Sequence, residues 1–314
     1  MLKDALGDRM KEYEDITRYK LPRKSLVLGR IDGNAFHTYT KGLKRPFDQD
    51  LINDMDSTAI YLCQELQNVK FAFVQSDEIS LFMREDGRDT QSWFNNVLQK
   101  MGSIGASKAT TEFNRRRLMR DMELIFKASI KTISDNEFSI VQRGQNIIEN
   151  FKMAEFDARF WTVPSAIEVY NYFLWRQRDA EKNSISAAAQ SLYSHKELEG
   201  KNGLVKQEMM WQKGVNWNDY PAGQKRGRFI EKRTYLNNRP VCLWKNEDDT
   251  KQFYFLDGPT PMNDTFEKDV WVASDYPTTK DGDIVRTNWE VVESPIFSQD
   301  VDFLLNRIKL PENA

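Results

Sequence analysis

Residues 69–83 read VKFAFVQSDEISLFM, two apolar runs that flank the polar tetrapeptide QSDE. Large apolar side chains occupy every second position from Val69 onward and again from Ile79 onward. A period of two is typical of β-strands, in which successive side chains point to opposite faces of the sheet. The stretch therefore predicts a β-hairpin with residues 75–78 at its tip.

On the N-terminal side of this hairpin, residues 25–33 (SLVLGRIDG) form a short apolar run that ends at Asp32 and Gly33. We expect a buried strand here, with an acidic residue at its C-terminal end. Between this strand and the hairpin, apolar residues recur at helical spacing over residues 51–66, and Asp48 is a suitable N-cap. This segment predicts an amphipathic helix.

On the C-terminal side, apolar stripes predict helices over residues 94–105 and about 118–133, then a strand over 154–163 and another helix. The order strand, helix, hairpin, helix, strand, helix is that of a split β-α-β antiparallel sheet of the ferredoxin-like kind. We therefore expect an α+β domain with a helical elaboration over residues 1–230. From 231 to 314, short β-rich segments alternate with turn clusters, which predicts a separate β-rich C-terminal extension.

The composition is that of a globular chain. Of 314 residues, 40% are hydrophobic and 29% are charged, which argues against disorder. Lys and Arg number 45 and Asp and Glu 47, so the net charge is −2, and nucleic-acid binding would need a local basic patch. No apolar run approaches the ~18 residues of a membrane span, and the N-terminal residues lack the apolar core of a signal peptide. We expect a cytoplasmic protein with no membrane partner.

Cysteine and histidine are scarce. The chain has only Cys63, Cys242, His37 and His195, widely separated in the sequence. This rules out a disulfide framework and a zinc site. A bound metal would need oxygen ligands, which favours Mg²⁺ or Mn²⁺.

Acidic residues stand at two places that the expected sheet makes neighbours. Asp32 ends the first strand, and Asp77 and Glu78 lie at the hairpin tip. Two carboxylates held close together repel each other, and a divalent cation relieves that repulsion. The Gly33 carbonyl could add an oxygen ligand, and two Mg²⁺ ions ~4 Å apart would suit an in-line phosphoryl displacement. Asp and Gly are also common in turns, so the same residues could serve only as turn formers.

Five short motifs follow one another along the chain, and two of them contain these acidic residues. They are RIDGNAFH at residues 30–37, RPFD at 45–48, QSDE at 75–78, FDAR at 156–159 and WRQRD at 175–179. They resemble R-[IV]-D-G-x-x-F-H, K-P-N-D, Q-S-D-E, F-D-G-R and W-R-Q-x-D of the tRNA-His guanylyltransferases and their relatives, the 3′-to-5′ polymerases. The likeness extends over about residues 5–230.

The resemblance implies a polymerase-like palm with two Mg²⁺ ions and nucleotidyl transfer to an RNA 5′ end. In this family an NTP activates a 5′-monophosphate end, which the 3′-hydroxyl of an incoming nucleotide then attacks. ATP or GTP would be the activating and donor nucleotides, tRNA the RNA partner, and the protein a homotetramer.

The resemblance also assigns roles to residues. The side chains of Asp32 and Asp77 and the carbonyl of Gly33 would be the metal ligands. Glu78 would support catalysis by the two aspartates. Nucleotide contacts fall to Arg30, Asn34, Phe36, His37, Arg45, Asp48, Ser76 and Lys100.

Contact with RNA requires local basic residues. The candidates are Arg115, Arg116, Arg117, Arg176, Arg178, Asn183, Lys225, Arg226 and Arg228. Each group could equally be a solvated face of a charge-rich protein. Trp175 lies at helical spacing from Tyr172, which is more typical of a core residue than of a base-stacking platform.

Three positions depart from the family's motifs. Arg45 replaces Lys, Phe47 replaces Asn, and residues 181–184 (EKNS) replace the His of the helix motif. Because these positions lie where the family recognises nucleotides, addition to other RNAs fits as well as strict guanosine addition to tRNA-His. Two further hypotheses stay open, namely a palm-type nucleotide cyclase or small-nucleotide synthase, and an RNA-binding protein that has lost catalysis.

Overall fold

The computed structural model describes residues 4–87, 89–131, 149, 151–237, 241–245, 251–255, 271–272 and 284–309. The chain divides into two compact units. Unit 1 comprises Met1–Glu231 and Val291–Ala314, and unit 2 comprises Lys232–Glu290.

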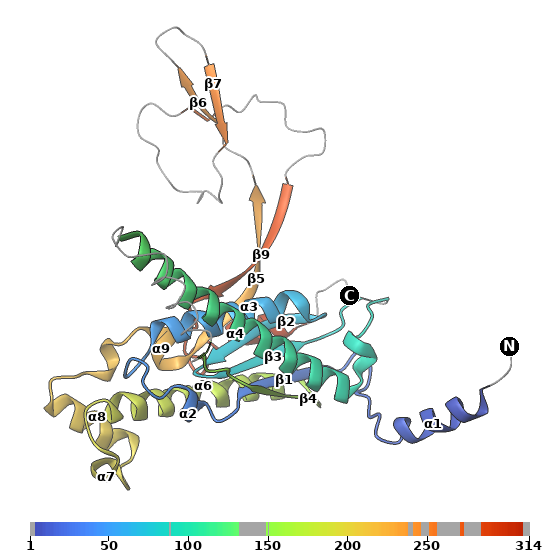
Figure 1. Ribbon diagram of the computed structural model, residues 1–314, viewed down its shortest axis with the longest axis horizontal. Helices are drawn as coiled ribbons and strands as arrows, with labels where there is room; N and C mark the ends of the chain where they lie inside the picture. Colours follow the sequence, from blue (N-terminus) through green and yellow to red (C-terminus); the bar gives the residue numbers. More distant parts are fainter. Residues whose placement is uncertain are drawn as a thin grey trace. The chain divides into compact units, whose positions relative to one another are not determined.

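Helices and strands both occur along the chain, and most of them are labelled in Figure 1. The helices are α1 (Ala5–Asp15), α2 (Phe36–Tyr39), α3 (Gln49–Glu65), α4 (Leu98–Lys131), α6 (Ala166–Gln190), α7 (His195–Leu198), α8 (Gly203–Gln212), α9 (Ala222–Arg226), α10 (Val301–Ile308) and the 3₁₀ helices η1 (Trp93–Asn96) and η2 (Trp217–Asp219). The strands of the larger sheet are β1 (Leu26–Gly33), β2 (Val69–Gln75), β3 (Glu78–Met83), β4 (Phe156–Val163), β5 (Arg228–Asn237) and β9 (Ile284–Val292).

The larger sheet has six strands in the order β4-β1-β3-β2-β5-β9. The pairings of β1 with β3 and β4, and of β2 with β3 and β5, are all antiparallel. The expected hairpin is present, and its tip is a two-residue turn because Gln75 pairs directly with Glu78. The expected α+β class is confirmed.

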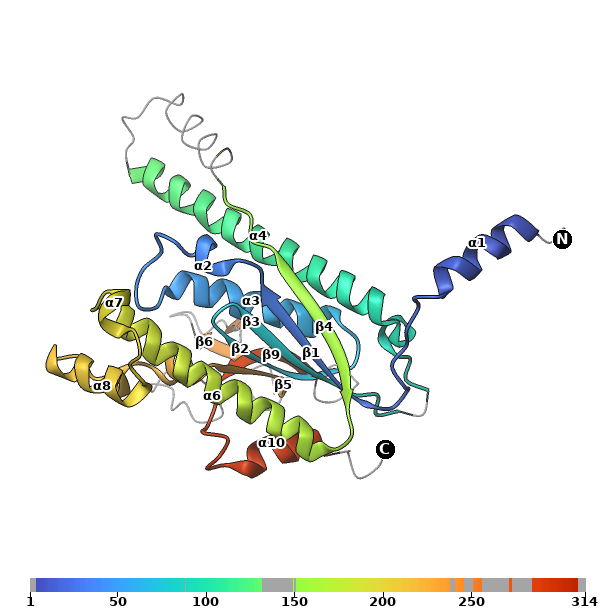
Figure 2. The same ribbon diagram turned by 90° about the horizontal axis from the view of Figure 1, so that it is seen from below.

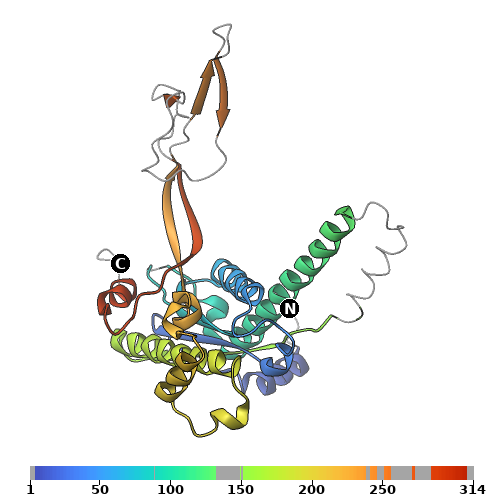
Figure 3. The ribbon, with the colours of Figure 1, turned by 90° about the vertical axis from the view of Figure 1, so that its left-hand side faces the viewer.

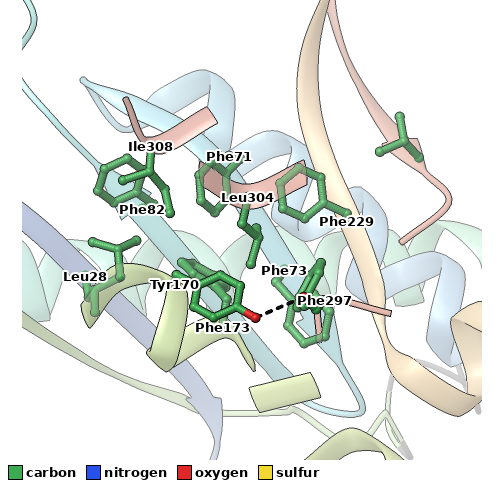
Figure 4. Close-up of a cluster of buried hydrophobic side chains, with 12 residues drawn as sticks. Leu28, Phe71, Phe73, Phe82, Tyr170, Phe173, Phe229, Phe297, Leu304 and Ile308 are labelled. Carbon is green, nitrogen blue, oxygen red and sulfur yellow. Dashed lines mark hydrogen bonds between the residues drawn. The ribbon is translucent and has the colours of Figure 1, made fainter. Parts of the chain in front are cut away.

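Helices cover both faces of this sheet, with α3 and α4 on one side and α6 on the other (Figures 2 and 3). Phe71, Phe82 and Leu28 point toward α6, where they pack around Phe173 and around α10 (Figure 4). Within this core the Tyr170 hydroxyl donates a hydrogen bond of 3.0 Å to the Phe297 carbonyl.

The structure differs from the expected elements at α4 and α10. One 34-residue helix, α4, replaces the two helices expected over 94–105 and 118–133. Buried Ala109 and Phe113 continue its apolar stripe through the expected break. At the C-terminus, α10 is a helix within the region expected to be β-rich, because Leu304 and Ile308 recur four residues apart and are buried.

The region expected to form the β-rich extension is therefore divided. Residues 291–314 cluster with unit 1. Unit 2 contains β6 (Val241–Lys245), β7 (Lys251–Phe255) and β8 (Trp271–Val272), which form a sheet in the order β7-β6-β8. Within the described part of the chain, no helix has the length and apolar character needed to cross a membrane.

Gly29 in β1 gives a test of this packing. Its cross-strand partner is Phe160, whose ring lies so close that a Cβ at Gly29 would come within 2.5 Å of it. We expect Gly29→Ala to reduce the free energy of unfolding by ~1–3 kcal/mol, measured by urea denaturation, although alanine is ordinarily no worse than glycine in a strand. Gly203→Ala is the control, since its Cβ would meet only Ile185 at 3.9 Å. Equal stability of the two variants would contradict this packing.

Candidate active site

The C-terminal end of β1 and the hairpin turn are joined by a main-chain hydrogen bond. The Gly33 amide donates to the Asp77 carbonyl over 3.1 Å, and Asp32 pairs across the ladder with Glu78. The structure thus brings Asp32 and Asp77 to one end of the sheet from positions 45 residues apart in the sequence. The turn is tight because Ser76 adopts φ +47°.

The environment of the Asp77 carboxyl group opposes its ionisation. Burial, and to a smaller extent the charge of Asp32, raises the pKa of the Asp77 carboxyl, although hydrogen bonds from its own amide and from Ser76 oppose the rise. A divalent cation would favour the ionised form. Among the residues that the structure describes, no group of three His, Cys, Asp or Glu side chains forms a metal site. The chain therefore offers a cation two carboxylates and main-chain oxygens here.

Gly33 has a packing reason to lack a side chain. A Cβ at Gly33 would come within 2.2 Å of the Phe36 ring. Phe36 is itself buried against Phe113 and Phe156, with ring centroids 5.7 and 5.3 Å apart. The expected nucleotide contact of the Phe36 side chain is therefore replaced by a core contact, which positions the β1 terminus.

Glu78 forms a buried ion pair with Arg176. Its two carboxylate oxygens accept from Nε and Nη2 of Arg176 at 2.7 and 2.6 Å, and Ser80 donates to it at 3.0 Å. Burial raises the pKa of the Glu78 carboxyl, and Arg176 offsets part of the rise. The pair ties the hairpin to α6. It also corrects the expectation that Arg176 contacts RNA, because both side chains are only 7% exposed.

Arg30 lies beside Asp32 on the same strand and face. Its Nε is 3.9 Å from an Asp32 carboxylate oxygen. This nitrogen is buried and has no hydrogen-bond partner within the described chain. A buried donor left unsatisfied in this way is a suitable partner for an anion.

The other residues assigned to nucleotide binding after β1 lie nearer the surface. The Asn34 side chain is 3.4 Å from the Glu155 carboxylate, and His37 is exposed, with its Nε2 3.1 Å from the Thr38 hydroxyl. Arg45 is exposed and precedes a cis peptide bond to Pro46.

Asp48 and Lys100, which are also assigned to nucleotide binding, lie at the starts of α3 and α4. Asp48 caps α3, and the amides of Leu51 and Lys44 donate to its two oxygens at 2.9 and 3.1 Å. Burial opposes these hydrogen bonds, but they lower the pKa of the Asp48 carboxyl. Lys100 lies in the first turn of α4 and is exposed.

A cavity of about 140 Å³ opens beside the hairpin turn. It lies between the start of α3, α6 and α9, and it is lined by Gln75 and Ser76 of the hairpin together with Asn183 and Arg228. Phe47 and Asp48 also line it. The sequence indicated Phe47 as a departure from the family motif but gave no sign of the cavity, because its walls come from four separate segments.

The first expected basic cluster is paired with nearby acids. Arg115 and Arg116 both bond to Glu112, at 2.8 and 2.6 Å, while Arg117 lies 3.7 Å from Asp121. The cluster therefore presents less positive charge than the sequence suggests.

The second expected basic cluster is largely internal. Lys225 is buried and donates to the Asn218 carbonyl at 2.5 Å, and burial lowers its pKa. Arg226 bonds to Glu181 at 3.1 Å. Arg228 is buried and bonds to Asp56 at 2.5 Å. The expected RNA contacts of Lys225 and Arg228 are thereby corrected.

The exposed surface of α6 carries two of the remaining candidates. Arg178 is exposed, and Asn183 is exposed with its amide 3.2 Å from Asp179. Trp175, expected in the core, is instead 52% exposed, with the Arg176 guanidinium 4.4 Å from its ring centroid. The helical stripe turns this ring outward because Phe173 and Gln177 occupy the buried face.

The Glu78–Arg176 pair can be tested by stability. We expect Arg176→Met to lower the free energy of unfolding by ~3–5 kcal/mol, measured by urea denaturation, because it leaves a buried carboxylate unpaired. Adding Glu78→Gln to that variant should recover part of the loss. Arg178→Met, two residues away and exposed, is the control and should change stability little. A loss of the same size in both single variants would argue against the buried pair.

Comparison with known proteins agrees with the motifs. A family model described as tRNAHis guanylyltransferase matches residues 7–164. Structures of a bacterial tRNAHis guanylyltransferase-like protein in complex with ATP and with GTP superpose with TM-scores of 0.67 and 0.66 at 34% and 35% identity, covering 98% of this chain and all of theirs. A probable tRNAHis guanylyltransferase of Drosophila melanogaster is 26% identical, over 70% of this chain and 71% of its own length. The chain therefore belongs to the tRNAHis guanylyltransferase family of nucleotidyltransferases.

Proposed function

We propose that this protein is an Mg²⁺-dependent nucleotidyltransferase that adds nucleotides to the 5′ end of an RNA, with tRNA as its principal substrate. The observation that carries the proposal is the hydrogen bond between Gly33 and Asp77, which holds two acidic strand ends together. The bacterial relatives bound to ATP and GTP support a nucleoside triphosphate as ligand. The sheet order β4-β1-β3-β2, with Asp32 at the end of β1, supports a polymerase-like palm.

Asp32 and Asp77 would hold the metal by their side chains and Gly33 by its carbonyl. The donor set fits, because hard divalent cations prefer carboxylate and carbonyl oxygens and the half-buried Asp77 lies near a second negative charge. When bound, two Mg²⁺ ions would stabilise the charge that develops on the attacking and leaving oxygens.

The proposed reaction consists of two phosphoryl displacements. In the first, an oxygen of the RNA 5′-monophosphate attacks the α-phosphorus of ATP or GTP, and pyrophosphate leaves. In the second, the 3′-hydroxyl oxygen of the donor nucleotide attacks the activated 5′-phosphorus. The hydroxyl proton passes to solvent, and the activating mononucleotide leaves.

The protein's own side chains would position these groups. Arg30 Nε, buried and without a partner within the described chain, would donate to a phosphate oxygen. The Glu78–Arg176 pair would keep the hairpin turn fixed against α6. On the exposed side of α6, Trp175 would stack on an RNA base and Arg178 would contact phosphate. A homotetramer would combine the RNA surfaces of several subunits, which suits a chain with a net charge of −2.

Substitution of Asp32 and Asp77 tests the proposed metal-dependent reaction. With 5′-phosphorylated RNA, labelled NTP and Mg²⁺, we expect RNA that is one or more nucleotides longer at its 5′ end. Asp32→Asn and Asp77→Asn should each lower the rate by ~100-fold or more, and chelation by EDTA should abolish it. Asp157→Asn is the matched control. Asp157 pairs across the ladder with Asp32, but it is 52% exposed and bonds to Arg159.

The outcomes separate the open hypotheses. Product from NTP without RNA would indicate a cyclase or small-nucleotide synthase. RNA binding without extension, for all four NTPs and a pool of cellular RNAs, would indicate a binding protein that has lost catalysis. Equal losses in the Asp157 and Asp77 variants would remove the case for a specific metal site.

A further inference from the structure

The solvent-facing side of α6 carries two cations whose charge is not used within the fold. Arg178 and Lys182 are exposed, and neither forms an ion pair with any of the described residues. The acidic residues that lie between them or beside them in α6, Asp179 and Glu181, are bonded to other arginines. Unlike the two basic clusters that pair with acids or are buried, these charges are available to a ligand.

A third cation continues the same line. Lys206 of α8 donates from its Nζ to the Ser186 hydroxyl at 3.0 Å, and α8 lies beside the C-terminal end of α6 (Figure 2). Lys206 has no acidic partner in the part of the chain that the structure covers. Residues 178, 182 and 186 follow one another at intervals of about one helical turn, or about 6 Å along the axis. We call Arg178, Lys182 and Lys206 the α6 basic row.

An aromatic ring stands at one end of this row. Trp175 is 52% exposed, and it precedes Arg178 by three residues and Lys182 by seven, so the three side chains share one face of α6. Arg176 and Tyr172 contact the ring from the protein side, at 4.4 and 5.9 Å from its centroid. An exposed ring held in this way is a platform on which a nucleic-acid base can stack.

We propose that a single-stranded segment of the RNA substrate lies along α6, with a base stacked on Trp175 and successive phosphates bound by the α6 basic row. The inference rests on the proposed function for the identity of the ligand as RNA. A base can stack on a protein ring only where it is not stacked inside a duplex. Cations one turn apart in a single line follow one backbone, whereas an A-form duplex presents two strands across a wide groove. The substrate class is therefore an RNA with unpaired nucleotides beside the reacting end.

The row begins next to the acidic site and leads away from it. Arg176, which follows Trp175, bonds through two nitrogens to Glu78, the residue after Asp77. Ser186 is eleven residues farther along α6 than Trp175, or about 16 Å along the axis. The unpaired segment thus has its Trp175 end nearest the carboxylates. Such a narrow track suits a chain whose net charge is −2.

The test is binding of RNA to the full chain in buffer that contains neither NTP nor Mg²⁺, measured by fluorescence anisotropy. The two probes are a labelled single strand of about ten nucleotides and the same strand annealed to its complement. The single strand should bind about tenfold more tightly, because only its bases are free to stack on Trp175.

Each cation of the row should contribute to the salt dependence of this binding. Arg178→Gln, Lys182→Gln and Lys206→Gln should each make the slope of log K against log salt concentration less negative by about 0.7, the value for one phosphate of a single strand. Trp175→Ala should lower the affinity about tenfold and leave the slope unchanged. Lys11→Gln is the matched control. Lys11 is exposed on α1 without an ion pair among the described residues, and its substitution should change neither quantity.

Three results would overturn the inference. They are equal affinity for the duplex, no measurable binding of either probe, and a change of slope in Lys11→Gln as large as in the row variants. Thermal melting checks that each variant folds, and if Lys206→Gln does not, the variants of the exposed Arg178 and Lys182 decide. Because the assay contains neither NTP nor Mg²⁺, a failure of RNA extension counts only against the proposed function. Intact extension, with row variants that bind RNA like the unmodified protein, counts only against this inference.

Discussion

Repulsion between two carboxylates at one end of a sheet is the constraint around which the site is built. Asp32 and Asp77 come together because the Gly33 amide bonds to the Asp77 carbonyl, and Asp77 is half-buried beside the tight turn at Ser76. Such an arrangement is unfavourable for the chain alone, since both burial and a like charge oppose ionisation of Asp77. This unfavourable arrangement supports the divalent-cation site proposed above.

The surrounding structure holds this end of the sheet in place. Glu78 follows Asp77 directly, yet its carboxylate faces α6 and is bound by Arg176 at both oxygens. On the opposite side, Phe36 packs over Gly33 and leaves no room for a Cβ. The hairpin and the β1 terminus are thus fixed from both faces of the sheet, and the adjacent acidic residues Asp77 and Glu78 have different tasks.

The distribution of basic residues limits the charged surface that is available for the proposed RNA contact. Arg115 and Arg116 pair with Glu112, and Lys225 and Arg228 are buried, so much of the apparent basic charge is used within the fold. Arg178 and Trp175 remain exposed on α6. Stacking on an aromatic ring therefore has a larger part in the proposed RNA contact than a broad basic surface.

The sequence by itself determined the local elements and the family. Alternation over residues 69–83 predicted the hairpin, and the ordered motifs predicted the family, because both depend on residues close together in the chain. Only the tertiary structure decided which charged groups are buried and paired within the protein. Glu78 and Arg176 are 98 residues apart, and the walls of the cavity beside the hairpin turn come from four segments. Pairing and burial of charges arise from contacts between distant segments, which no local pattern encodes.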